Sequence, residues 1–129
     1  EENFKNTVDL VKMIMPLKTH IFPYSSRPGT LAANFSGAVD PGLISARCKR
    51  LEKVACECQS MFMQKFIGKK ELVLIEGAVK DDANFLEGLT DNYLKARLPF
   101  KPGLKNKIVK VRLKRILGSN FVGEYVDNS

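Results

Sequence analysis

The C-terminal half of the chain alternates between hydrophobic and basic residues over positions 107–115. This alternation is typical of a strand that buries one face, because successive side chains of a strand point to opposite sides. The hydrophobic face consists of Val109, Val111 and Leu113. The opposite face carries a row of cations, Lys110, Arg112 and Lys114. Side chains on one face of a strand stand roughly 6.5–7 Å apart, and cations at that spacing suit a repeated polyanion better than a single small acid.

A second alternating stretch lies at 93–98. Its hydrophobic face consists of Leu94, Ala96 and Leu98, and its polar face of Tyr93, Lys95 and Arg97. Aromatic rings stack on bases and cations meet phosphates in the small barrels that hold single-stranded nucleic acid. Lysine on a strand face also has a plain structural explanation, because it discourages edge pairing. Two such rows in one short segment favour RNA binding over that explanation.

These two stretches belong to a series of five predicted strands in residues 68–129. The strands are expected at 71–75, 84–88, 93–98, 107–116 and 121–125. Turn-forming residues separate them, at Gly77, 90–92, Pro102-Gly103 and 118–120. Short strands with turn signals between them predict a small antiparallel β-barrel of the OB-like kind.

Residues 1–36 follow a different pattern. Four apolar residues recur at helical spacing up to Pro16, namely Phe4, Val8, Val11 and Met15, and predict an amphipathic helix. Residues 19–24 then read as a short strand, followed by a turn-rich loop at 25–30. One helix and one strand cannot bury their own faces. This segment therefore predicts one repeat of an α/β sheet whose other strands lie elsewhere, and the start at Glu1 suggests a piece of a longer protein.

A long helix is expected between these two parts, over residues 37–67. Asp40-Pro41 predicts its N-terminus and Gly68 its C-terminal cap. Such a helix would span roughly 40 Å, which indicates a connector. The fold class is therefore α+β, with divisions at 1–36, 37–67 and 68–129.

Composition restricts the classes of function. The 129 residues are 44% hydrophobic and carry a net charge of +7, and residues 68–129 hold 12 Lys and Arg against 8 Asp and Glu. No apolar run is long enough to span a membrane, and no signal sequence is evident. We expect a cytoplasmic protein without a membrane partner.

The three cysteines do not predict a metal site. Cys48, Cys56 and Cys58 have the spacing C-x7-C-x-C, which matches no common zinc or cluster motif. On one helix Cys56 and Cys58 point about 200° apart. We interpret all three as small helix residues in a reducing compartment, and His20 as a packed strand residue.

Several stretches of the chain resemble a known protein family. The stretches IGKKELVLIEG, FLEGLTDNYLKARLPF, LKNKIVKVRLKRI and FVGEYV resemble the TRAM domain, a small RNA-binding β-barrel. The stretch HIFPYSSRPGTLAA resembles the last strand and following loop of the radical S-adenosylmethionine barrel in tRNA methylthiotransferases, and ISARCKRL is also similar to that family. The pattern H-x-F-P-Y-S-x-R-x-G-T with G-x-T-D-N-Y is most similar to the branch that modifies threonylcarbamoyladenosine beside the anticodon.

The resemblance implies a C-terminal part of such an enzyme, with the tRNA anticodon stem-loop and the rest of the radical enzyme as partners. The family uses 4Fe-4S clusters and S-adenosylmethionine, held by C-x3-C-x2-C and three further cysteines. Neither motif is present, so we expect this chain to bind no cofactor, to contain no catalytic or metal-binding residue, and to be inactive alone. The alternatives are a stand-alone RNA-binding adaptor or chaperone and a module that binds acidic protein.

The candidate RNA-binding residues are Tyr93, Lys95, Arg97, Lys110, Arg112 and Lys114. Tyr24 and Arg27 are candidates for the edge of the active site in the full enzyme, because Tyr24 ends the predicted barrel strand and Arg27 follows it, on the side where such barrels place their active sites. The alternative for Arg27 is a loop arginine that bonds nearby carbonyls. For residues 90–92 we weighed RNA contact against turn formation and favour the turn. Leu89 stands where several members of the family that the chain resembles carry a polar or aromatic residue, which weakens any contact assigned to position 89.

Overall fold

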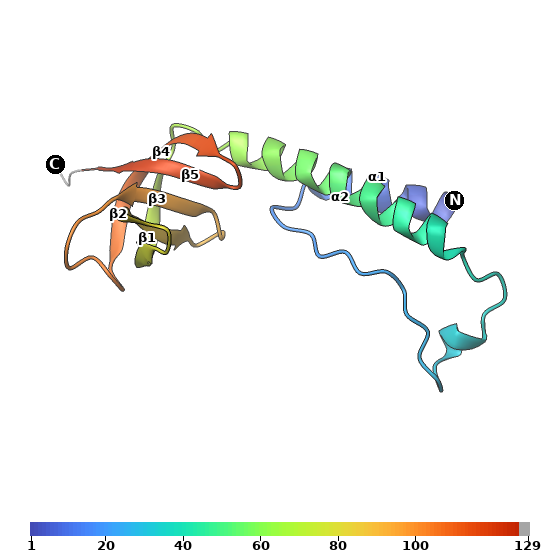
Figure 1. Ribbon diagram of the computed structural model, residues 1–129. Helices are drawn as coiled ribbons and strands as arrows, with labels where there is room; N and C mark the ends of the chain where they lie inside the picture. Colours follow the sequence, from blue (N-terminus) through green and yellow to red (C-terminus); the bar gives the residue numbers. More distant parts are fainter. Residues whose placement is uncertain (127–129) are drawn as a thin grey trace. The chain divides into compact units, whose positions relative to one another are not determined.

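The computed structural model describes residues 1–126, and the chain divides into two compact units (Figure 1). The first unit comprises Glu1–Met61 and the second Phe62–Ser129. The division falls within the long helix α2, Pro41–Gln64.

The first unit is organised around two helices, α1 (Glu2–Ile14) and α2. Their shared core contains three buried residues, Val8 of α1 and Val54 and Cys58 of α2. The partly buried residues packed around this core are Phe4, Val11, Met15 and Leu51. The apolar spacing predicted for the first helix is therefore confirmed, and its buried face is the one that contacts α2. The Cys58 thiol is 1% exposed and donates a hydrogen bond to the Val11 carbonyl, in keeping with a packing role.

The start of α2 is capped as the sequence predicts. The Asp40 carboxylate oxygen Oδ1 accepts hydrogen bonds from the backbone N–H groups of Gly42 at 2.8 Å and Leu43 at 3.2 Å. Pro41 occupies the first helical position, where the missing N–H has no helical partner to lose.

The strand predicted at 19–24 is wrong. Between α1 and the short 3-10 helix η1 (Leu31–Asn34), the chain forms neither helix nor strand. A strand requires a neighbour for its backbone hydrogen bonds, and within residues 1–126 no strand lies in the first unit. His20 is accordingly exposed rather than packed, with its ring stacked near Phe22 at a centroid distance of 6.5 Å.

The second unit is a closed five-stranded barrel (Figure 1). Its strands are β1 (Lys70–Val79), β2 (Asp82–Thr90), β3 (Lys95–Pro99), β4 (Ile108–Leu117) and β5 (Asn120–Tyr125). The order around the barrel is β1-β2-β3-β5-β4, and β4 returns to pair with β1. Four pairs are antiparallel, but β3 and β5 pair in parallel. The prediction of an antiparallel barrel is corrected in this respect: the sheet is mixed, because the 20 residues between β3 and β5 bring β5 back beside β3 in the same direction.

The barrel core confirms the alternation seen in the sequence. The core residues exposed by 1% or less are Val73, Ile75, Leu94, Ala96, Leu98, Val111, Leu113 and Phe121. Gly77 was expected to break the chain, but it lies inside β1, where the pairing register shifts between Ile75 and Gly77. An unpaired extra residue of this kind is a β-bulge, and glycine in a strand often marks one.

Candidate nucleic-acid interface

The cation row of β4 lies on the outside of the barrel, and much of it is already paired. The Arg112 Nε and Lys114 Nζ atoms lie 3.6 and 3.2 Å from the two carboxylate oxygens of Glu124 on β5. Within residues 1–126, Lys110 forms no ion pair. The three lysine and arginine side chains therefore differ in their availability to a phosphate.

The cation row of β3 is also partly paired, in this case with a carboxylate on β2. The Lys95 Nζ atom lies 2.9 Å from Glu87 Oε2 on β2. Arg97 pairs in register with Glu87 on β2 and with Val122 on β5. Its Nε atom is buried and has no hydrogen-bond partner among the described residues.

Tyr93 lies in a turn rather than in the strand predicted for it. Its backbone is left-handed, with φ of 64°, and β3 begins only at Lys95. The turn is held by Thr90, whose hydroxyl donates to Asn92 Oδ1 at 2.6 Å and accepts from the Leu94 N–H at 2.9 Å. Thr90 and Asn92 therefore form the turn, as the sequence favoured, and the Tyr93 side chain is left 75% exposed.

The barrel topology separates the two cation rows. β5 lies between β3 and β4 on one side, and β2 and β1 lie between them on the other. The pairing register across the second route places Ile108 opposite Leu74, Leu74 opposite Leu89, and Leu89 opposite Lys95. Lys110 lies opposite Leu72. The residues that join the two rows are thus leucines and an isoleucine.

These apolar residues line a surface hollow of about 530 Å³, which we call the outer hollow. Its lining residues are Lys70, Glu71, Leu72, Leu74, Leu89, Thr90, Asp91, Tyr93, Ile108 and Lys110. Tyr93 and Lys110, predicted from separate stretches, therefore meet at one hollow. Sequence reasoning missed Lys70, Leu72, Leu74 and Ile108. A signal was present, since Leu72–Ile75 are all apolar, which means that β1 shows apolar side chains on both faces.

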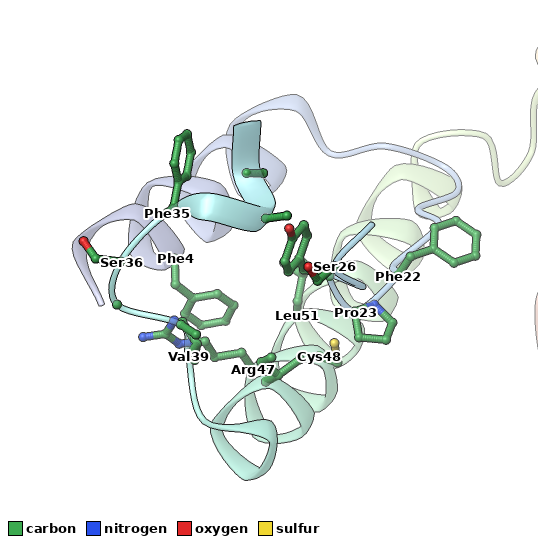
Figure 2. Close-up of a pocket in the computed structure, with 16 residues that line it drawn as sticks. Phe4, Phe22, Pro23, Ser26, Phe35, Ser36, Val39, Arg47, Cys48 and Leu51 are labelled. Atoms are coloured by element: carbon green, nitrogen blue, oxygen red, sulfur yellow. The ribbon is translucent and has the colours of Figure 1, made fainter. Parts of the chain in front are cut away.

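The other candidate residues belong to the first unit. Tyr24 lines a hollow of about 580 Å³ between the 22–39 segment and the helices. Figure 2 shows Phe4 and Leu51 directed into this hollow and Phe35 directed away from it. Arg47 also lines it, with its guanidinium 5.4 Å from the Phe4 ring centre and 3.0 Å from Glu1 Oε2. Because Arg47 donates this hydrogen bond, the pKa of the Glu1 carboxyl lies below its usual value.

Arg27 is not among the residues that line this hollow. It is exposed, and its carbonyl accepts a hydrogen bond from the Thr30 hydroxyl at 2.9 Å. The structure therefore does not bring Arg27 and Tyr24 to one lining surface.

Comparison with known proteins identifies relatives over nearly the whole chain. A protein of Pyrococcus horikoshii named "Probable threonylcarbamoyladenosine tRNA methylthiotransferase" is 33% identical over 127 residues, which is 98% of this chain and 28% of that protein. The "tRNA-2-methylthio-N(6)-dimethylallyladenosine synthase" of Francisella tularensis subsp. novicida is 29% identical over 126 residues, again 98% of this chain and 28% of the relative. The chain is related to the tRNA methylthiotransferases. It corresponds to the C-terminal part of such proteins and spans little more than a quarter of their length.

No protein-family model matches the chain. Among solved structures, the apo form of Mycoplasma genitalium RNase R is similar over 65% of this chain and 18% of that chain, at 13% identity. The TM-score of this match is 0.39.

Residues 1–126 of this chain do not provide the ligands of an iron–sulfur cluster. Clusters of this kind are held by several cysteine thiolates at one place. Cys48, Cys56 and Cys58 are free, and residues 1–126 contain no group of three His, Cys, Asp or Glu side chains that could hold a metal ion. No helix of this part is long and apolar enough to cross a membrane.

Proposed function

We propose that this chain is the tRNA-binding part of a tRNA methylthiotransferase. The observation that carries the proposal is a barrel with outward rows of cations in a chain whose relatives are named for tRNA methylthiolation. The barrel binds tRNA and positions the anticodon stem-loop. The rest of the protein supplies the 4Fe-4S clusters and S-adenosylmethionine chemistry that adds the methylthio group, and this chain contributes no group to that chemistry.

The substrate nucleoside is N6-threonylcarbamoyladenosine. Two features support this choice over the dimethylallyl type. The chain is 33% identical to the Pyrococcus protein of the threonylcarbamoyl type and 29% identical to the Francisella protein of the other type. The motifs at 20–30 and 88–93 point the same way.

Within the barrel, the cations have two kinds of role. Lys110 forms no ion pair within residues 1–126 and is available to a phosphate at once. Lys95, Arg112 and Lys114 are held by Glu87 and Glu124, and each must exchange a carboxylate for a phosphate. Exposed pairs of this kind contribute only about 0–1 kcal/mol, so the exchange costs little. Tyr93 stacks on a base, because its ring is held outward by the Thr90 turn.

The first unit faces the remainder of the enzyme. Its 19–39 segment exposes several large apolar side chains, including Phe22 at 83%, Leu31 at 82% and Phe35 at 72%. Exposed apolar surface on this scale is typical of an interaction site. Tyr24 and Arg27 lie in this segment and reach the edge of the active site when the full enzyme is assembled.

A salt titration of tRNA binding tests the proposal. Because Lys110 neutralises a phosphate, Lys110→Ala should weaken binding to every tRNA alike and reduce the slope of log affinity against log salt by about one or less. Tyr93→Ala should weaken binding with little change in slope, because it removes a stacking surface worth roughly 1–3 kcal/mol per base. Tyr93→Phe should be mild, since the ring is retained.

Lys80→Ala is the matched control, because Lys80 is exposed in the turn between β1 and β2 and does not line the outer hollow. It should change the affinity less than Lys110→Ala does. The proposal is wrong if the folded wild-type chain shows no salt-dependent tRNA binding, or if Lys110→Ala and Tyr93→Ala both bind tRNA as the wild type does at low salt.

A further inference from the structure

The outside of the barrel carries an apolar surface that has no partner within the described residues. Leu72 is 60% exposed, Leu74 46% and Ile108 66%. The three lie together because β1 and β4 pair with Leu74 opposite Ile108 and Leu72 opposite Lys110. Barrel interiors need only one apolar face per strand, so the second apolar face of β1 requires a different explanation.

The rim of this surface is chemically mixed. Tyr93 stands at one side on its left-handed turn, 75% exposed. Lys110 and Lys70 also line the hollow, and within residues 1–126 neither forms an ion pair. The cations farther along the strands, Arg112 and Lys114, are occupied by Glu124. In the outward row of β4, Lys110 is thus the cation without an ion pair among the described residues, and it lies beside the apolar floor.

We propose that the outer hollow binds one unpaired nucleobase of a single-stranded RNA segment. The base lies on Leu72, Leu74 and Ile108 against the Tyr93 ring, and the flanking phosphates contact Lys110 and Lys70. Asp91, which also lines the hollow, accepts a hydrogen bond from an amino group on the base edge, as acidic side chains do from cytosine N4. This inference rests on the proposed function and adds the part of the RNA that the barrel reads.

The basic charge of the surrounding strands favours nucleic acid, and not an apolar protein segment, as the occupant of the outer hollow. The two strands under the hollow, with the residues just before them (69–79 and 107–117), contain seven Lys and Arg against two Glu. Arg112 and Lys114 are paired with Glu124, but Lys70 and Lys110 form no ion pair within residues 1–126. An apolar protein segment would leave these two lysines without partners, whereas a nucleic-acid strand supplies a phosphate for every base. A duplex is excluded because its bases are stacked inside, and proteins reach bases mainly where the strand is unpaired.

Two oligonucleotides separate base binding from phosphate binding. A short single-stranded RNA is compared with an abasic chain of equal length and charge, both titrated against the full chain and followed by fluorescence anisotropy. We expect the RNA to bind about tenfold more tightly or better, since stacking of a single base accounts for a factor of that size. Methyl resonances of Leu72, Leu74 and Ile108 should move on addition of the RNA and stay nearly unchanged with the abasic chain.

Substitutions of the leucine and isoleucine side chains under the base test whether the preference for RNA over the abasic chain arises at the outer hollow. Leu72→Ser and Ile108→Ser should each lower affinity for the RNA several-fold while leaving affinity for the abasic chain unchanged. Leu117→Ser is the matched control: Leu117 is also on β4 and is 50% exposed, but it does not line the hollow. It should leave both affinities unchanged.

The outcomes distinguish the two proposals. Equal affinity of the wild type for RNA and abasic chain, or folded floor variants that keep the wild-type preference, would overturn the base-binding hollow but leave salt-dependent tRNA binding standing. Absence of binding to either chain and to tRNA at low salt would overturn the proposed function as well.

Discussion

Gly88 of β2 lies against the backbone of β1 with no room for a side chain. A Cβ atom at this position would meet the Leu74 carbonyl oxygen, would lie 2.9 Å from its carbonyl carbon and would lie 2.8 Å from Val73 Cγ1. Two of these atoms are backbone and cannot turn away. The close approach of β1 and β2, and with it the position of Leu74 in the outer hollow, therefore depends on one glycine.

We predict that Gly88→Ala destabilises the barrel by roughly 1–3 kcal/mol or more, the usual cost of overpacking a core. Urea unfolding of the full chain, followed by tyrosine fluorescence or NMR, measures the change. Gly77→Ala is the control, because no heavy atom lies within 4 Å of its added Cβ, and it should shift stability by less than about 1 kcal/mol. Equal stabilities of the two variants would contradict the argument.

Single residues of the site were only partly predictable. Lys110 and Tyr93 could be found because a local pattern marks them. The apolar run at 72–75 marks Leu72 as an outward apolar residue of β1. Its proximity to Ile108 could not be predicted, because it depends on the register between β1 and β4, strands that lie far apart in the sequence. The alternation at 93–98 also extends one residue too far: Leu94 is buried as expected, but Tyr93 belongs to the turn with φ of 64°.

At the scale of elements, local signals were sufficient where the element is stabilised locally. Asp40 and Pro41 start α2 where the sequence places the helix, because a cap acts within one turn. The segment at 19–24 resembles a strand by composition, but its strand structure depends on a neighbour that residues 1–126 do not provide. The parallel pairing of β3 with β5 has no local signature, since it follows from how the whole barrel closes.

The Asp40 side chain caps the start of α2, and its contribution to helix stability can be measured. Asp40→Ala removes the acceptor for the Gly42 and Leu43 N–H groups and should cost about 0.5–2 kcal/mol of helix stability. Hydrogen exchange of those two amides should accelerate, while exchange near Val54 and Cys58 changes little. Asp40→Asn keeps an acceptor oxygen and should behave nearly as the wild type. Unchanged exchange in the alanine variant would show that the cap does not stabilise the helix start.

At the scale of the whole molecule, the two units differ in the size of their buried apolar cores. The barrel buries a continuous set of residues between its strands, whereas the buried apolar core of the first unit among described residues is Val8, Val54 and Cys58. A small core stabilises a fold only marginally. The sequence indicated this contrast, because five alternating strands can close on themselves and one helix with one apolar segment cannot.

We therefore predict that residues 62–129 fold alone and that residues 1–61 do not. The isolated barrel should give a dispersed NMR spectrum and slow amide exchange in β1 and β4, with a cooperative thermal transition. The isolated first unit should exchange rapidly throughout 16–39. Protection of that segment equal to the protection of β4, in a dilute monomeric sample, would count against the prediction.

The return of β4 to β1 has one more consequence. In the closed barrel every strand has a neighbouring strand on both sides, so no strand lies at an open edge that an incoming strand could extend along its length. The module is thereby protected from edge-to-edge aggregation. It also cannot bind a peptide by adding it as a sixth strand. Side chains on the outside of the strands are then the groups that the sheet itself offers to a ligand, so point substitutions can change what it selects without rebuilding the scaffold.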